Sequence, residues 1–470
     1  MASTFEDNIA NVRQLYAKLG TSSRVDDFTV NKSIFLALDA VRESVASANE
    51  KSFSNPNLAV LEDVCTGASV ALVRSTVVNL VAIYTLIIQK APGYVVRNIL
   101  NSMIVICNGK TTSNISKECA VQVMTSVMIN KPNDCANQIN EIVVLLTRLS
   151  KLTDLPLKIA CFKCISGIIS GSGSKIGDVH AEVLKMAVRF SADKSVEVRV
   201  TVATIMRQIA ENSEGFTSVP MDSVLSPATR GLEDETAVVQ DAFAAAVSAV
   251  FCEQVNAYMV NQEQAKQGMA RGSGSVKSVK KAPTLSQRIS ITKLTMSTKK
   301  VVDEWDFRSV VTYLHQQLTL GSNTLRTGYL TVLGYVVRTL LDSLSPDDYE
   351  WLVLSTIAVL KDSPALRELT YEEQAYLRCR FSHFLRTSIT SAATETQLLT
   401  LAGILVKNIS TVETNAHSDL ELQLVLGELS NVLTALGPAA TALVEEVNMS
   451  ASTYLRCVNS PTISTWQSLI

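Results

Sequence analysis

Residues 191–210, SADKSVEVRVTVATIMRQIA, join a turn of small and polar residues to an apolar run with a helical period. The large apolar residues of this run recur at i, i+4, i+7 and i+11 and therefore share one helix face. They are Val198, Val202, Ile205 and Ile209. The preceding turn at Asp193 offers side-chain oxygens that can cap the new helix. The stretch therefore predicts an amphipathic helix that starts just after a capping turn.

The same arrangement recurs along the chain at a nearly constant interval. At five positions, a polar or basic residue stands near the start of an apolar helix. The intervals between neighbouring positions are 43, 41, 41 and 41 residues. These residues are Arg74, Lys117, Lys158, Arg199 and Gln240. Further apolar helices are expected before the last four of them, within 92–107, 135–150, 179–192 and 219–232.

Two helices in about 40 residues, with a polar residue opening the second, are typical of HEAT repeats. One such pair cannot cover its own apolar face, so consecutive pairs must stack. The sequence therefore predicts an all-α fold, a HEAT-repeat α-α solenoid built as a superhelical array of antiparallel helix pairs. A helical domain without repeats is the alternative.

The composition agrees with a helical, non-basic protein. The 470 residues are 47% apolar and 18% charged, with only 11 prolines and 19 glycines to serve as turn residues. A formal charge of -2 excludes a generally basic nucleic-acid binder, so no specific nucleic acid is expected. The most apolar window, 75–90, is broken by Asn79 and is shorter than the roughly 20 residues of a membrane span. At most peripheral membrane association is expected.

Four regions are expected from the pattern. N-terminal helices occupy 1–50, and the first of them carries Phe5, Ile9, Val12 and Leu15 on one face. A first block of HEAT repeats follows at 51–268, then a basic Gly/Ser/Lys-rich flexible insertion at 269–302. A second block of repeats covers 303–470. Because its last helix opens and stops within a few residues, we expect the chain to be the N-terminal part of a longer protein.

The insertion is the most basic part of the chain. No acid occurs between Glu263 and Asp303, and many Ser and Thr residues accompany the cations. A possible basic docking strip consists of Lys277, Lys280, Lys281, Arg288, Lys293, Lys299 and Lys300. Two interpretations stay open. The segment is either a solvated insertion without a binding role, or a docking or phosphorylation strip whose charge phosphate groups would cancel.

Two glycine-containing segments imitate nucleotide-binding motifs. NGKTT at 108–112 has the Gly-Lys-Thr of a phosphate-binding loop, but Ile104 stands where the first glycine is required. GSGSKIG at 171–177 has Ile176 in place of the third glycine of a dinucleotide fingerprint, and it follows a helix. Both segments are interpreted as turns between helices.

The cysteines and histidines do not form a catalytic or metal-binding pattern. The nine cysteines are odd in number and lie mostly in apolar runs, which indicates reduced core thiols and a cytosolic setting. Zinc at Cys161 and Cys164 would need two further ligands, and the nearest candidate is His180. The other histidines, at positions 315, 383 and 417, are far away in sequence. The sequence predicts no enzyme, no metal and no cofactor.

The order of segments resembles the N-terminal region of the HEAT-repeat-containing protein 5 family. The resemblance rests on Asp193 to Arg199, LEDETAVVQDAFAAAVSAV at 232–250, ARGSGSVKS at 270–278 and ELQLVLGELSNVLTALGPAATALVEEV at 421–447. It covers roughly 65–470. Gln240, where a repeat arginine is expected, and the basic stretch 276–300 depart from it.

The resemblance implies a non-catalytic scaffold or accessory protein that supports clathrin adaptor recruitment and vesicle sorting between the trans-Golgi network and endosomes. It implies clathrin adaptor subunits or a small co-adaptor as partners, and a cytoplasmic protein peripheral at those membranes. It supplies no binding residues. The alternative is a HEAT-repeat nuclear transport receptor or a phosphatase-type regulatory scaffold, which shares the helix-pair architecture.

Overall fold

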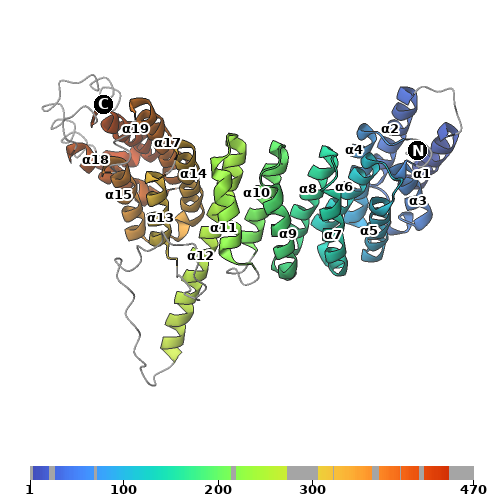
Figure 1. Ribbon diagram of the computed structural model, residues 1–470, viewed down its shortest axis with the longest axis horizontal. Helices are drawn as coiled ribbons and strands as arrows, with labels where there is room; N and C mark the ends of the chain where they lie inside the picture. Colours follow the sequence, from blue (N-terminus) through green and yellow to red (C-terminus); the bar gives the residue numbers. More distant parts are fainter. Residues whose placement is uncertain are drawn as a thin grey trace. The chain divides into compact units, whose positions relative to one another are not determined.

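The computed structural model describes residues 4–20, 27–67, 71–212, 219–271, 305–320, 322–362, 370–391, 393–411 and 418–443 (Figure 1). Throughout these ranges the regular structure is helical, and they contain no strand. The chain divides into two compact units, Met1–Val250 and Phe251–Ile470. The prediction of an all-α protein is therefore confirmed.

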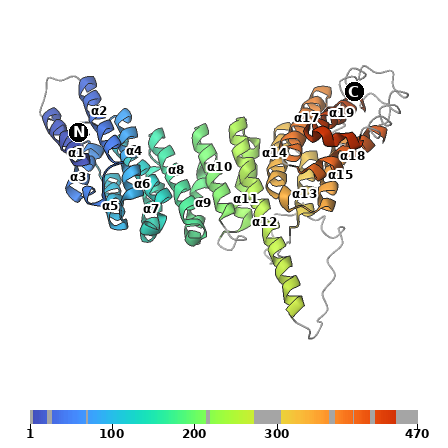
Figure 2. The same ribbon diagram turned by 180° about the vertical axis from the view of Figure 1, so that it is seen from behind.

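The first unit consists of short helices joined by tight turns (Figure 2). Its helices are α1 (Phe5–Gly20), α2 (Asp27–Ser44), η1 (Glu50–Ser52), α3 (Asn55–Thr66), α4 (Arg74–Lys90), α5 (Gly93–Asn108), α6 (Asn114–Asn130), η2 (Pro132–Gln138), α7 (Ile139–Leu149), α8 (Leu155–Ser172), η3 (Gly173–Ile176), α9 (Gly177–Phe190), α10 (Val196–Glu211), α11 (Met221–Arg230), η4 (Gly231–Glu233) and the start of α12 (Ala237–Arg271).

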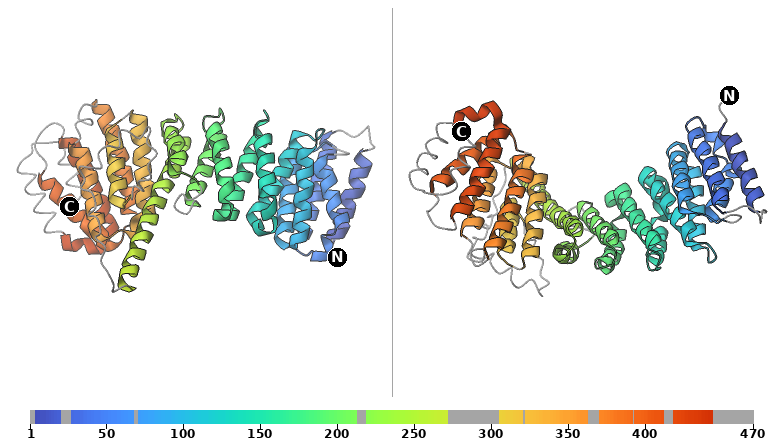
Figure 3. Two further views of the ribbon diagram at one scale, coloured as in Figure 1. Left: turned by 60° about the horizontal axis from the view of Figure 1, so that its bottom comes forward. Right: turned by 90° about the horizontal axis from the view of Figure 1, so that it is seen from above.

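These helices form two layers (Figure 3). In one layer α2, α4, α6, α8 and α10 each pack on the next, and in the other α1, α3, α5, α7, α9 and α11 do the same less extensively. Contacts within pairs, such as α5 with α6 and α9 with α10, join the layers. The first unit is thus a stack of helix pairs, the HEAT-type solenoid that the 41-residue interval predicts. The N-terminal helices α1 and α2 belong to the same stack.

Helix α8 illustrates why the stack holds together. It contacts α6, α7 and α10, and fully buried side chains cover a wide part of its surface, among them Cys161, Phe162 and Cys164. Gly171 lets α8 approach α6 closely, because an added Cβ would lie 2.2 Å from the carbonyl oxygen of Met128. The close packing of the second helices therefore depends on a missing side chain as well as on apolar burial.

The second unit repeats the paired pattern with α13 (Phe307–Thr319), α14 (Asn323–Leu340), η7 (Leu341–Ser343), α15 (Pro346–Asp362), α17 (Tyr371–Phe384), η8 (Leu385–Thr390), α18 (Glu395–Thr411), α19 (Ser418–Leu436) and η9 (Gly437–Leu443). Helices α13 and α14 pack together, as do α18 and α19, and α14 packs on α17. Segment η8 is a π-helical turn. The part of α12 after Val250 joins this unit, where Phe251, Trp305 and Tyr313 form an aromatic cluster with ring centroids 5.5 to 5.7 Å apart.

In the part of the chain that the structure describes, two helices are long and apolar enough to cross a membrane by length and composition alone. They are α8 and residues Ala237–Gln262 of α12, and 50% and 61% of their most apolar windows are buried inside the protein. Such burial is typical of core helices in a packed helical array.

Candidate interaction surface on the repeat turns

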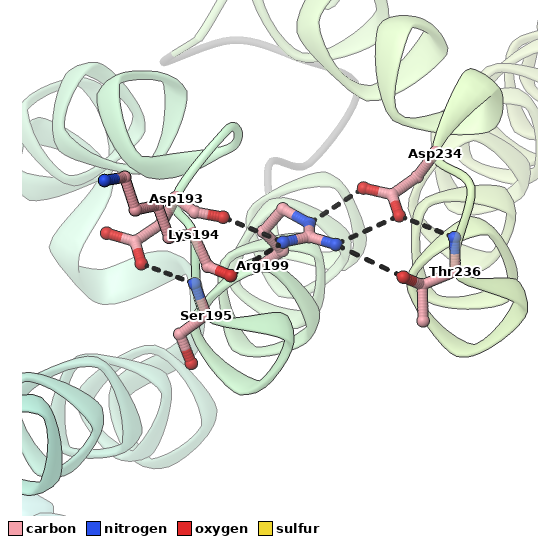
Figure 4. A network of polar contacts seen from close by, with 6 residues as sticks. All are labelled: Asp193, Lys194, Ser195, Arg199, Asp234 and Thr236. Carbon is pink, nitrogen blue, oxygen red and sulfur yellow. Dashed lines mark hydrogen bonds and ion pairs between the residues drawn. The ribbon is translucent and has the colours of Figure 1, made fainter.

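Ion pairs connect successive helix pairs of the first unit, and Figure 4 shows the pair that Arg199 forms with Asp234. Lys158, in the first turn of α8, places its Nζ 3.0 Å from Oδ2 of Asp193, which lies in the turn before α10. One repeat later, Arg199 donates from Nε to Oδ2 of Asp234 at 2.8 Å and from Nη2 to Oδ1 at 3.1 Å. All four side chains are largely buried, between 13% and 18% exposed. We call this series the charge ladder.

The ladder also fixes the conformation of the turns. Arg199 Nη1 donates to the carbonyl oxygens of Asp193 at 2.8 Å and Lys194 at 3.4 Å. Asp193 Oδ1 accepts a hydrogen bond from the backbone N–H of Ser195 at 2.9 Å. Ser195 is the N-cap of α10, but its own side chain makes no capping bond. The side-chain oxygen of Asp193, predicted from the sequence to cap α10, therefore stabilises the turn before the helix. Arg199 stabilises the same turn by donating to its carbonyl oxygens.

The ladder carboxylates are stabilised in their charged form. Burial alone would raise the pKa of Asp193, but the N–H of Ser195 and the ammonium of Lys158 overcome this and hold the pKa below its usual range. At Asp234 burial again raises the pKa, while Arg199 and the N–H of Thr236 lower it by more, so that the pKa is also below its usual range. Both acids are thus ionised at neutral pH and hold their cations.

The ladder stops at both ends for reasons visible in the sequence. Gln240 occupies the position of Arg199 one repeat later, and its Nε2 donates to the carbonyl oxygen of Leu232 at 2.7 Å. At the other end, Lys117 occupies the position of Lys158, but the position of the acid is held by Leu152. The ladder therefore spans the repeats between α8 and α12.

A second row of polar contacts joins the same helices near their C-terminal ends. Thr85 of α4 bonds Ser126 of α6 at 2.7 Å. Gln208 of α10 accepts from Ser166 of α8 at 2.9 Å and donates to Ser170 at 2.7 Å. Consecutive second helices therefore run parallel with matching ends side by side. Their N-terminal turns lie along one edge of the unit, and their C-terminal turns along the opposite edge.

The residues with catalytic potential are used in the core. Seven of the eight cysteines in the described ranges are buried, and Cys379 is exposed, whereas Cys457 lies outside those ranges. Burial raises the pKa of the Cys164 thiol to about 12 and that of Cys161 further. His180, on α9, is fully buried, and burial lowers its pKa. Among the described residues no group of three or more His, Cys, Asp or Glu could hold a metal ion.

The glycine-containing segments are turns between helices, as expected. NGKTT at 108–112 joins the end of α5 to the N-cap region of α6, and GSGSKIG at 171–177 spans the end of α8 and η3. The basic docking strip at Lys277, Lys280, Lys281, Arg288, Lys293, Lys299 and Lys300 lies outside the described residues.

No protein-family model and no curated protein matches the chain. Among solved structures, it is similar to Kap95p in a structure concerned with Kap95p binding to RanGDP, with 13% identity, a TM-score of 0.49, and coverage of 97% of this chain and 51% of that one. A Kap121p mutant matches with 11% identity and a TM-score of 0.46 over 93% of this chain and 38% of that one. A designed armadillo repeat protein matches with 15% identity and a TM-score of 0.35 over 50% of this chain and 98% of that one.

Proposed function

We propose that the protein is a non-catalytic scaffold that supports clathrin adaptor recruitment and vesicle sorting between the trans-Golgi network and endosomes. The observation that carries the scaffold role is the ladder-bound stack of helix pairs in the first unit. Such a stack exposes a long surface without needing a deep pocket, and extended partners bind these surfaces through many modest contacts.

The use of the reactive side chains supports a non-catalytic role. Lys158 and Arg199, near the starts of α8 and α10, form ion pairs with Asp193 and Asp234 in the following turns. Burial holds the Cys164 thiol in its protonated form at neutral pH, so it is a poor nucleophile. These groups stabilise the array and are not arranged around a substrate.

The particular partner is proposed from the sequence resemblance to the HEAT-repeat-containing protein 5 family. On this proposal, the protein is cytoplasmic and peripheral at trans-Golgi and endosomal membranes, and it binds adaptor subunits directly or through a small co-adaptor. The two units would serve as a binding arm.

Affinity purification of the full-length protein from cells, followed by identification of co-purifying proteins, tests this proposal. Recovery of clathrin adaptor subunits or a small adaptor-binding protein, together with overlap with a trans-Golgi marker in microscopy, is the expected result. Recovery of nuclear import cargo, or of a phosphatase catalytic subunit, without any adaptor subunit would contradict it and favour the transport-receptor or phosphatase-scaffold alternative.

A further inference from the structure

A lysine recurs in three successive turns between the first and second helix of a pair. Lys110 follows α5, Lys151 follows α7 and Lys194 follows α9, at intervals of 41 and 43 residues. All three side chains are exposed. Within the ranges that the structure describes, none of their amines forms an ion pair or a side-chain hydrogen bond. The three charges are therefore available to a partner.

Two side-chain contacts show that these turns lie next to one another. Arg148, near the end of α7, donates to Asn108 Oδ1 at the end of α5 at 2.6 Å, which links the first turn to the second. Lys158 and Asp193 link the second turn to the third. The lysines therefore form a row along the edge where the second helices begin, which we call the lysine edge.

Exposed apolar residues accompany the lysines. The first residue of α8, the first of α10 and the second of α12 are apolar and lie 41 and 42 residues apart. They are Leu155, Val196 and Val238, which are 43%, 42% and 64% exposed. Two successive repeats thus have an exposed lysine close in sequence to an exposed aliphatic residue, and the next repeat has the aliphatic residue alone.

A further lysine, at the position where the charge ladder stops, adds positive charge at the α6 end of the lysine edge. Lys117 is half-buried near the start of α6 and has Leu152 where its ladder acid would be. At the other end the sign reverses, because the turn before α12 carries exposed Glu233 and Glu235. The acids in the lysine turns are Asp154, which caps α8, and Asp193, which pairs with Lys158. The positive stretch is therefore limited to three turns and ends before Glu233.

We infer that the lysine edge binds an acidic segment of a protein partner in an extended conformation. Packed helices lie about 8–10 Å apart and an extended chain advances about 3.3 Å per residue, so roughly three residues span one repeat. Acids at every third position would meet Lys110, Lys151 and Lys194 in turn, with apolar residues between them placed near Leu155 and Val196. A flat anionic membrane fits less well, because Glu233 and Glu235 border the row.

The inference rests on the protein-binding role proposed above and names the surface and the chemistry of the partner. It does not depend on which protein supplies the acidic segment. Each exposed lysine contributes weakly, so affinity comes from the row as a whole and falls as salt screens it.

The test uses a fluorescein-labelled peptide of about twelve residues with glutamate at every third position and leucine before each glutamate. Its affinity for the 470-residue chain is measured by fluorescence anisotropy at low and moderate salt. The test variant combines Lys110→Glu, Lys151→Glu and Lys194→Glu. The matched control combines Lys51→Glu, Lys131→Glu and Lys175→Glu, which change the charge equally in turns of the opposite edge.

We expect the lysine-edge variant to bind the peptide about tenfold more weakly and the control variant to stay within about twofold of the parent chain. Circular dichroism should be unchanged in both. Equal weakening by the two variants, or no weakening by the first, would overturn the inference. A second outcome would also overturn it: the parent chain does not bind the peptide but binds vesicles with about 30% phosphatidylserine, and the lysine-edge variant loses the vesicle binding.

The outcomes separate this inference from the proposed function. Peptide binding through the lysine edge, with no adaptor subunit recovered from cells, would support the surface and contradict the adaptor role. The opposite outcome is that adaptor subunits are recovered from cells but the three lysine substitutions do not change the peptide affinity. It would support the adaptor role and contradict the lysine edge as a binding surface.

Discussion

Arg199 and Asp234 lie 35 residues apart in sequence, and the guanidinium of the first donates two hydrogen bonds, of 2.8 and 3.1 Å, to the carboxylate of the second. Both side chains are largely buried, at 14% and 16% exposed. The pair joins the start of α10 to the turn before α12. Its contribution to stability can be measured against an exposed pair in the same helix.

Replacing Arg199 with Met should destabilise the first unit by about 2 kcal/mol, because it leaves the Asp234 carboxylate largely buried without its cation. Arg207→Met is the control, since Arg207 pairs with Glu211 at 3.3 Å while both are nearly half exposed. That change should cost no more than about 0.5 kcal/mol. Urea unfolding, with hydrogen exchange in α10 as a local probe, measures both. Equal effects of the two variants would contradict the ladder's stabilising role.

Adding one methyl group at Gly171 should destabilise the contact between α6 and α8. The new Cβ would lie 2.2 Å from the Met128 carbonyl oxygen, and a backbone atom cannot move aside without separating the helices. We expect Gly171→Ala to cost about 2 kcal/mol in thermal unfolding followed by circular dichroism. Gly403→Ala, on α18, meets nothing within 4 Å and should be neutral or slightly stabilising. A Gly171→Ala protein as stable as its parent would show that α8 is not held that closely.

The second unit should lose stability in mild acid because of His315. Thr356 Oγ1 donates to the Leu352 carbonyl at 2.7 Å, so at 3.2 Å it accepts from Nε2–H of a neutral imidazole. Burial lowers the pKa of His315 to about 4. Since the unfolded chain takes up a proton near pH 6.5 and the folded chain does not, stability falls as pH drops from about 6.5 to about 4, by about 3 kcal/mol in all.

The pH effect is isolated by substitution. His315→Gln removes the titrating group and keeps a donor toward Thr356, so its unfolding free energy should vary less between pH 6.5 and 4 than that of the parent chain. His383→Gln, at an exposed position of α17, should keep the parent's pH profile. Parallel pH profiles for the parent and His315→Gln would refute the assignment.

Only one thiol in the described ranges should react quickly in the folded protein. With Cys457→Ser as background, a thiol reagent such as dithionitrobenzoate should label Cys379 first, since the other seven cysteines are buried. Burial also raises the pKa of Cys135 to about 11, which leaves little thiolate at neutral pH. All eight should react in denaturant. Fast labelling of Cys161 or Cys164, or stoichiometric zinc that Cys164→Ser removes, would contradict their role as core thiols.

The positions of the helices in the first unit could be predicted from the sequence because a nearly constant interval of about 41 residues constrains these pairs together. The helix expected within 92–107, for example, is α5 (Gly93–Asn108). The π-helical turn at Leu385–Thr390 could not be predicted, because its apolar pattern is also compatible with an α-helix that continues from α17.

The ladder was only half visible in the sequence. Asp193 and Arg199 stand out as a repeated pattern within one segment, and the pattern predicts a local cap. Their main partners, Lys158 and Asp234, belong to neighbouring repeats, so the pairing depends on how the helices stack. The lysine edge could also have been found from the sequence, because Lys110, Lys151 and Lys194 recur at intervals of 41 and 43 residues. Lys110, however, lies inside NGKTT, where the sequence pattern indicates only an imperfect phosphate-binding loop.

The ladder has a direction: each cation forms its ion pair with the carboxylate of the next turn, and the contacts of Arg199 with the turn before it are with backbone carbonyls. This makes the segment from 173 to 213 an interchangeable module. If it were duplicated in tandem, Lys158 would meet the first Asp193, the first Arg199 would meet the second Asp193, and the second Arg199 would meet Asp234. The array could be lengthened at this point by an engineer, or by a gene duplication, with every charge of the ladder matched.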